Sequence, residues 1–152
     1  MDFAYYRDLL FNFDGRINRG KYWLAFLVWF IVLCIAVVAT FLFGFLFGYW
    51  MTYAIVGFMM LLGVLGILSG IAVGIKRLHD RNKSGWWLLM FYVVPALLEG
   101  IGGIAGSSGA IFSLASFAIS IWALVEFGCL RGTDGPNTHG PDPLAAGAAQ
   151  PA

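Results

Sequence analysis

The chain has 152 residues, of which 61% are hydrophobic and only 11% are charged, and its formal net charge is +1. A soluble domain carries about 25% charged residues, so this composition excludes an ordinary soluble domain and indicates that lipid is the main solvent. We expect one membrane domain, residues 1–143, with an all-α fold. Cys34 and Cys129 stand apart in separate apolar runs, which favours buried thiols over a disulfide or a zinc site.

The N-terminal residues place apolar side chains on one helical face, at Phe3, Tyr6, Leu10 and Phe13. This spacing predicts a short amphipathic helix in the membrane interface, although a frayed tail would fit the same few residues. Arg16, Arg19 and Lys21 follow, and a Tyr-Trp pair then opens the first long apolar run. Cations and aromatic residues in this order are typical of an anchor at the level of the lipid headgroups.

The apolar runs predict four membrane spans, at about 22–43, 53–75, 86–105 and 110–130. No charged residue lies between Tyr22 and Ile75, and that stretch is too long for one crossing of about 20 residues, so two antiparallel helices must share it. Pro95 falls inside the third span and predicts a kink there. The composition of residues 144–152 predicts a disordered tail.

Small residues mark one face of two spans. The second span carries Gly63, Gly66, Gly70 and Gly74, and the fourth carries Ser113, Ser116, Ser120 and Ala123. In lipid, small residues let two backbones approach closely, so we expect these faces to pack together in a four-helix transmembrane bundle. The glycines could instead reflect the general frequency of glycine in membrane helices.

All nine cations lie before the first span, between the second and third, or after the fourth. In a four-span chain these segments share one side of the membrane. The positive-inside rule makes that side cytoplasmic, together with both termini.

Three motifs occur in order along the chain: Phe13-x-Gly15-Arg16-x-x-Arg19-x-x-Tyr22-Trp23, Lys76-Arg77-Leu78-His79-Asp80-x-x-x-Ser84-Gly85-Trp86-Trp87 and Gly135-x-Asn137-x-x-Gly140-Pro141-Asp142-Pro143. Over roughly residues 9–143 they resemble the DUF805 family, small bacterial inner-membrane proteins of unknown function. The resemblance implies a multi-pass protein of the bacterial inner membrane and implies no activity. The chain departs from the family pattern at two positions. Lys76 stands where the family more often has arginine, and His139 stands where it more often has an aromatic residue such as tyrosine.

All three motifs fall on the predicted cytoplasmic side, so their polar side chains are expected to converge in a polar cap of Arg16, Arg19, Arg77, His79, Asp80, Ser84, Asn137 and Asp142. Arginine forks there could bind an anionic lipid headgroup, a nucleotide phosphate or an acidic segment of a partner. Alternatively, the aspartates pair with arginines and pin the loops together, while other cations touch lipid phosphates. Both interpretations stay open at the level of sequence.

No catalytic site is apparent. His79 and Asp80 are adjacent, no motif marks a serine or cysteine nucleophile, and His79 and His139 lack the spacing of metal ligands. We therefore expect a non-enzymatic membrane scaffold or accessory protein, without cofactor or metal. Its expected partners are anionic lipid headgroups and a membrane-protein partner or a second copy of the chain, but not nucleic acid.

Glu126 lies inside the last apolar run. An acid within the membrane is by default a functional candidate, so the alternative function is a small oligomeric transporter or channel that uses Glu126. Its position near the cytoplasmic end would also let it pair with Arg131, Arg77 or Lys76.

Overall fold

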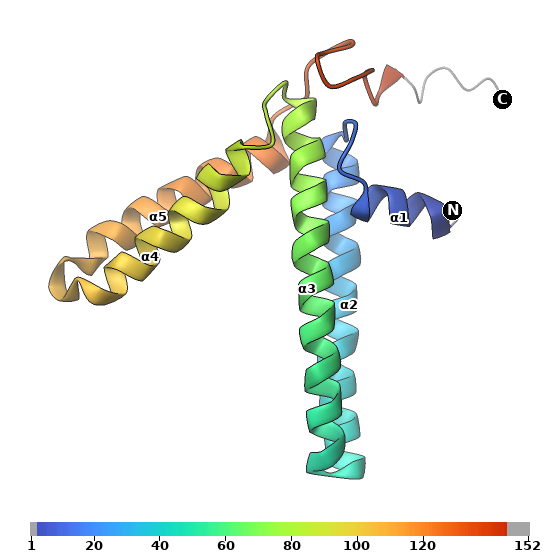
Figure 1. Cartoon of the computed structure of the whole chain (residues 1–152), viewed down its shortest axis with the longest axis vertical. Coiled ribbons are helices and arrows are strands. Elements are labelled where there is room, and N and C mark those ends of the chain that lie inside the picture. The colour runs from blue at the N-terminus through green and yellow to red at the C-terminus, as the bar shows by residue number, and fades with distance from the viewer. Residues whose placement is uncertain (1–2, 146–152) are drawn as a thin grey trace.

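Figure 1 shows the computed structural model, which describes residues 3–145 apart from the side chains of Tyr49, Thr52 and Ser107; most of the predicted tail, 146–152, lies outside this range. The elements are α1 (Phe3–Phe11), α2 (Arg19–Phe47), α3 (Tyr49–Asp80), the π-helical η1 (Leu89–Val93), α4 (Val94–Ile104), the short 3₁₀ turn η2 (Gly106–Ser108), α5 (Gly109–Leu124) and the π-helical η3 (Val125–Cys129). Three helical segments are long and apolar enough to cross a membrane, namely Arg19–Phe47, Tyr53–Asp80 and Gly109–Cys129, and Leu89–Ile104 is a shorter apolar one. The prediction of an all-α membrane protein is confirmed.

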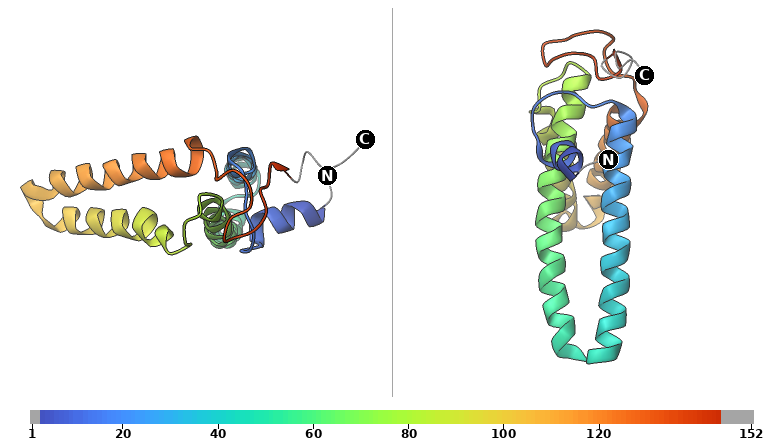
Figure 2. Two further views of the ribbon diagram at one scale, coloured as in Figure 1. Left: turned by 90° about the horizontal axis from the view of Figure 1, so that it is seen from above. Right: turned by 90° about the vertical axis from the view of Figure 1, so that its right-hand side faces the viewer.

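α2 and α3 form a long antiparallel hairpin, with the two helices side by side in both views of Figure 2. α2 begins after Asn18, whose side chain accepts the N–H of Lys21 at 2.9 Å and so caps the helix. α2 ends at Gly48, where φ is +76°, a conformation that glycine adopts without a steric penalty. The connection between the first two predicted spans, 44–52, is therefore reduced to one residue, because α2 continues to Phe47 and α3 begins at Tyr49.

α4 and α5 form a second, shorter hairpin. Gly102 and Gly109 let their backbones touch, since a Cβ on Gly102 would lie only 3.2 Å from the carbonyl oxygen of Gly109. On α5, the Ser116 hydroxyl donates to the carbonyl of Pro95 at 3.4 Å. The serine face therefore packs inside this hairpin, and its predicted packing against the glycines of the second span is wrong. Gly66 instead faces the ring of Trp29 on α2, which would lie 3.6 Å from a Cβ added to this glycine.

The irregularity expected at Pro95 takes the form of the π-helical segment η1, directly before it. Proline lacks an N–H, and its ring crowds the carbonyl group four residues earlier. A wider turn, closed by the N–H of Val94 on the carbonyl of Leu89, relieves that crowding.

The two hairpins diverge from a common end, so that the molecule is a wedge and not a bundle (Figures 1 and 2). They meet where η3 packs against α2 and α3. Among the described residues, no Cα atom of α4 or α5 lies within 8 Å of one in α2 or α3. The predicted four-helix bundle is therefore wrong in its packing, although the helices themselves are present.

Buried apolar side chains gather at the common end, in one cluster around Leu9, Ile17 and Val73 and another around Leu78 and Phe127. Elsewhere the helices expose apolar side chains on almost every face, and only 6% of the most apolar stretch of α2 or of α3 is buried. Exposure on this scale suits a lipid solvent, where apolar side chains need no protein partner.

α1 projects sideways from the first hairpin near the same end (Figure 1). Leu9 and Leu10 are its buried residues, whereas Phe3 is 84% exposed. The Lys76 ammonium donates to the carbonyl groups of Asp8 (2.8 Å) and Leu9 (2.7 Å) in the last turn of α1. A cation at the C-terminus of a helix satisfies unpaired carbonyl groups and complements the helix dipole, so Lys76 fixes α1 to α3.

Candidate functional site

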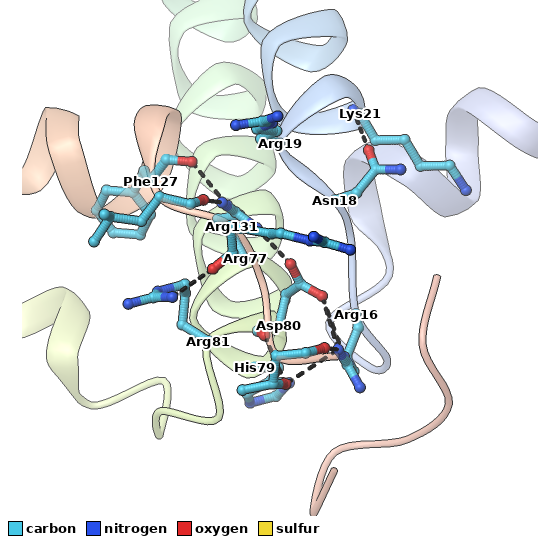
Figure 3. Close-up of polar contacts among 12 residues, drawn as sticks. Arg16, Asn18, Arg19, Lys21, Arg77, His79, Asp80, Arg81, Phe127 and Arg131 are labelled. Carbon is cyan, nitrogen blue, oxygen red and sulfur yellow. Dashed lines mark hydrogen bonds and ion pairs between the residues drawn. The ribbon is translucent and has the colours of Figure 1, made fainter. Parts of the chain in front are cut away.

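The centre of the polar end is Asp80, the last residue of α3. Residues 76–80, which the sequence assigned to a loop, form the last turn of this helix and place Arg77 and Asp80 one turn apart on one face. The Asp80 carboxylate is 3% exposed and lies between two arginines (Figure 3). Its Oδ1 accepts the Nε (3.2 Å) and Nη2 (3.1 Å) of Arg16, and its Oδ2 accepts Nη1 of Arg77. We call Arg16, Arg77 and Asp80 the Asp80 junction.

Arg16 ties the C-terminal loop to this junction. Besides Asp80, its Nη1 donates to the carbonyl groups of Gly135 (2.8 Å) and Gly140 (3.2 Å), and its Nη2 donates to that of Thr133 (2.6 Å). All five N–H groups of the guanidinium thus have acceptors within the chain. Arg16 comes from the loop between α1 and α2, so one side chain joins three parts of the sequence.

Arg77 joins the two hairpins. Its fully buried guanidinium donates through Nε to the carbonyl of Phe127 at 2.8 Å, and through Nη2 to that of Leu130. η3 ends at Cys129, and the last carbonyl groups of a helix have no partner within the helix, so they are available to accept from Arg77. Two side chains of α2 complete the set: Trp23 donates to the carbonyl of Gly128 at 3.1 Å, and Arg19 to that of Cys129 at 3.3 Å. The second hairpin is therefore capped by side chains of the first.

Gly132 and Thr133 belong to the site, and sequence reasoning missed both. Thr133 donates its backbone N–H (2.8 Å) and its hydroxyl (3.1 Å) to the carbonyl of Asp80. A Cβ on Gly132 would lie only 2.5 Å from Cγ of Asp80, a carboxylate that the two arginines hold in place. The available signal in the sequence was Gly132 itself, two residues after the end of the last predicted span.

His79 and Asn137 lie next to the junction. The Asn137 amide donates to the carbonyl of His79 at 2.9 Å, and the rings of His79 and His139 stack with centroids 3.9 Å apart and planes 5° apart. His139 thus contributes a flat ring against His79, a contact that an aromatic side chain can also make. Gly15 closes this side, its carbonyl 3.2 Å from Nδ1 of His79.

The remaining residues of the predicted cap lie at its edge. Asp142 accepts the N–H groups of Leu144 (2.8 Å) and Gly135 (3.0 Å), which hold the pKa of this carboxyl below its usual range. Ser84 lies in the loop before η1, where its hydroxyl accepts the N–H of Trp86 at 3.4 Å. The structure thus brings together Arg16, Arg77, His79, Asp80 and Asn137, with Arg19 on the cap of η3, while Ser84 stands apart.

Glu126 forms a second buried ion cluster. Its carboxylate is 4% exposed and accepts Nε of Arg81 at 3.1 Å and Nζ of Lys83 at 2.9 Å, both from the loop that follows α3. The predicted partners were Arg131, Arg77 and Lys76, and all three are wrong. Arg131 instead pairs with the exposed Asp134 at 3.0 Å.

Every buried side-chain nitrogen or oxygen in the described part of the chain has a hydrogen-bond partner. The junction therefore keeps no unused buried donor for a ligand. Within residues 3–145, no three histidine, cysteine, aspartate or glutamate side chains are grouped so that they could hold a metal ion. Arg7 on α1 and Arg131 after η3 are exposed.

A family model described as "Protein of unknown function (DUF805)" matches residues 10–141. The chain is similar to the inner membrane protein YhaH of Escherichia coli (strain K12), with 31% identity over 136 residues that cover 87% of each chain. It is also similar to the uncharacterized protein YiiR of the same strain, with 30% identity over 88% of this chain and 86% of YiiR, and to the inner membrane protein YhaI, with 31% identity over 87% and 86%. No solved structure matches it.

Proposed function

The chain belongs to the DUF805 family and is a multi-pass protein of the bacterial inner membrane, and from this premise we propose that it is a non-enzymatic membrane scaffold. In this proposal the Asp80 junction holds two apolar hairpins at a fixed divergence. The hairpins present their flanks to a membrane-protein partner or a second copy of the chain. The exposed residues Arg7 and Arg131, here called the outer cations, bind anionic lipid headgroups. The observation that carries the proposal is that each N–H group of Arg16 is already bonded within the chain.

A buried ion cluster suits a scaffold for a physical reason. Removing two arginines and an aspartate from water is costly, and their mutual attraction offsets that cost only when the geometry is well defined. Apolar contact between the hairpins is confined to their common end, where Leu78 and Tyr22 pack against Phe127, so it gives little leverage over the angle at which the long helices diverge. Hydrogen bonds from Arg16 and Arg77 are directional and would select one arrangement.

The proposal includes an orientation. All nine cations belong to segments at the junction end, which the positive-inside rule assigns to the cytoplasm. We propose four crossings, with both termini cytoplasmic and α1 in the interface. The segment Leu89–Ile104 has 16 residues and a length of about 24 Å, less than the roughly 30 Å of a hydrocarbon core, so its crossing would require local thinning of the bilayer.

Cysteine labelling tests the four crossings. In a variant without Cys34 and Cys129, a membrane-impermeant maleimide added to intact cells with a permeabilised outer membrane is expected to label Ser108→Cys. Asn82→Cys should be labelled only after the inner membrane is opened, because the proposal places it in the cytoplasm. Labelling of both positions from the same side would show that the α4–α5 hairpin enters the bilayer without crossing it.

The outer cations make the headgroup interaction testable. Arg7 and Arg131 are exposed, and within residues 3–145 the ion-pair partner of Arg131 is the exposed Asp134. Arg7→Gln combined with Arg131→Gln is expected to lower the retention of anionic lipid about thirtyfold, since each surface cation contributes about 1 kcal/mol. The measurement is mass spectrometry of the lipids that copurify with the protein from native membranes in mild detergent.

The matched control replaces the same two arginines with lysine, which keeps the charge and should keep the lipid. Equal retention by the glutamine and lysine variants, with no copurifying membrane protein in either, would contradict the proposed function.

The transporter hypothesis receives less support. Glu126 is buried as that hypothesis requires, but two cations from one loop neutralise it. An acid that carries protons or cations must exchange its partners, and a carboxylate shared by Arg81 and Lys83 is better suited to fixing the loop.

A further inference from the structure

The groove between the two hairpins has features of a lipid site, and we propose that it holds the acyl chains of one anionic phospholipid whose phosphate lies at Lys83. The inference deepens the proposed function, on which it rests, by assigning one lipid to one place. It differs from the general attraction of headgroups to the outer cations.

The groove runs along one face of α3. Its cavity has a volume of about 840 Å³. One wall is the face of α3 that carries Gly66, Gly70 and Ile71, and the opposite wall is η1 with Leu89 and Val93. The end nearest the junction is formed by the loop residues 84–86.

The chain does not fill this groove with its own side chains. A Cβ on Gly63 or Gly70 would meet no heavy atom within 4 Å, so the glycine face of α3 is unoccupied at these positions. Protein interiors tolerate few voids larger than a water molecule, and an apolar groove of this size inside a bilayer must hold something apolar. Because the hairpins diverge steadily, the occupant must adapt to a wedge, as flexible acyl chains do.

The loop at the closed end carries an uncompensated positive charge. Arg81 and Lys83 share the single carboxylate of Glu126, and their side chains are still 25% and 27% exposed. The Lys83 ammonium also lies 4.9 Å from the centre of the Trp87 ring, which limits its freedom. Lys83 is not itself among the residues that line the groove, but it directly precedes the lining residues 84–86, so this net positive charge adjoins the closed end and complements the phosphate of an anionic lipid.

Trp86 supports the same position for the headgroup. It follows Lys83 by three residues, lines the groove and is 77% exposed. Tryptophan is enriched at the level of lipid headgroups, where its ring has one side in hydrocarbon and its N–H in water. An apolar groove that ends at a cation and a tryptophan therefore matches the layout of a phospholipid.

Native mass spectrometry of the purified full chain tests this inference. The protein in mild detergent is titrated separately with dioleoylphosphatidylglycerol and dioleoylphosphatidylcholine. We expect one phosphatidylglycerol to bind more tightly than phosphatidylcholine. Gly70→Leu should weaken binding of both lipids about tenfold, the loss expected if two methylene groups leave the groove. Lys83→Gln should lower only the preference for phosphatidylglycerol, by about fivefold, as for one surface cation.

The matched control is Gly57→Leu, the same substitution on the same helix at a glycine with open space around it and outside the residues that line the groove. It should leave lipid binding unchanged. Val93→Trp fills the groove from the opposite wall, and it replaces Gly70→Leu as the test if that variant fails to fold.

Equal lipid binding by the groove variants and by Gly57→Leu would overturn the inference. It would also be overturned if the parent protein formed a dimer without bound lipid and Gly70→Leu abolished that dimer. Either result leaves the proposed function intact if the Arg7 and Arg131 glutamine variant still loses anionic lipid. Loss of lipid in the groove variants alone would support the groove and contradict the headgroup role of the outer cations.

Discussion

Asp80→Ala is expected to lower the free energy of unfolding by about 3–5 kcal/mol, the usual cost of removing one partner from a buried ion cluster. The guanidinium groups of Arg16 and Arg77, with side chains 1% and 0% exposed, would remain buried without their shared counter-ion. Asp80→Asn should be nearly as damaging, because the amide keeps the shape and loses the charge. Thermal unfolding in mild detergent, followed by tryptophan fluorescence, measures the effect.

Asp134→Ala is the control for Asp80→Ala. Asp134 lies on the same polar end and also pairs with an arginine, but both side chains are exposed, at 75% for Asp134 and 68% for Arg131. Exposed pairs contribute about 0–1 kcal/mol, so this variant should unfold almost like the parent protein. If the two alanine variants lose the same stability, Asp80 is not the centre of a buried junction.

Arg77→Met is expected to release the second hairpin from the first, in addition to destabilising the protein by about 3–5 kcal/mol. The methionine keeps the apolar stem and removes the donors to Phe127, Leu130 and Asp80. Spin labels at Phe47 and Ile104, which are 59% and 89% exposed near the tips of the two hairpins, report the separation. Pulsed electron paramagnetic resonance should give a narrow distribution of distances for the parent protein and a broad one for Arg77→Met.

Arg131→Met provides the comparison, since it makes the same substitution at an exposed arginine that bonds neither hairpin cap. Its distance distribution should stay narrow. A narrow distribution that persists in Arg77→Met would mean that apolar contacts at η3, rather than hydrogen bonds to its carbonyl groups, set the angle between the hairpins.

Those features of the fold that the lipid solvent requires could be predicted from the sequence. Lipid requires long apolar helices, so hydropathy predicted the membrane class and the helices, and the three motifs pointed to the correct family. Charges avoid hydrocarbon, so Arg16, Arg77 and Asp80 were placed on one side of the membrane together. That the structure joins them in one cluster follows from the cost of burying charge without a partner.

The packing of the hairpins could not be predicted, because small-residue faces accept several partners. The serines of α5 fit α4 as well as they would fit the glycines of α3, and no residue-level rule distinguishes the two. The acceptors of Arg77 were equally hidden, since Phe127 and Leu130 contribute backbone carbonyl groups that any residue would supply. Glu126 pairs with Arg81 and Lys83 because the loop after α3 passes beside η3. The positions of charges along the sequence do not predict the path of a loop.

The loop held by Arg16 has a consequence for biosynthesis. A chain is made from its N-terminus, so Arg16 and Arg77 leave the ribosome long before residues 133–140 exist. Until that last segment arrives, Arg16 lacks the carbonyl groups of Thr133, Gly135 and Gly140, and it must stay hydrated at the membrane surface. The two hairpins can insert early, but they are locked together only at the end of synthesis. A stalled or truncated chain would therefore expose N–H groups of Arg16 that lack their backbone acceptors, which distinguishes it from a finished one.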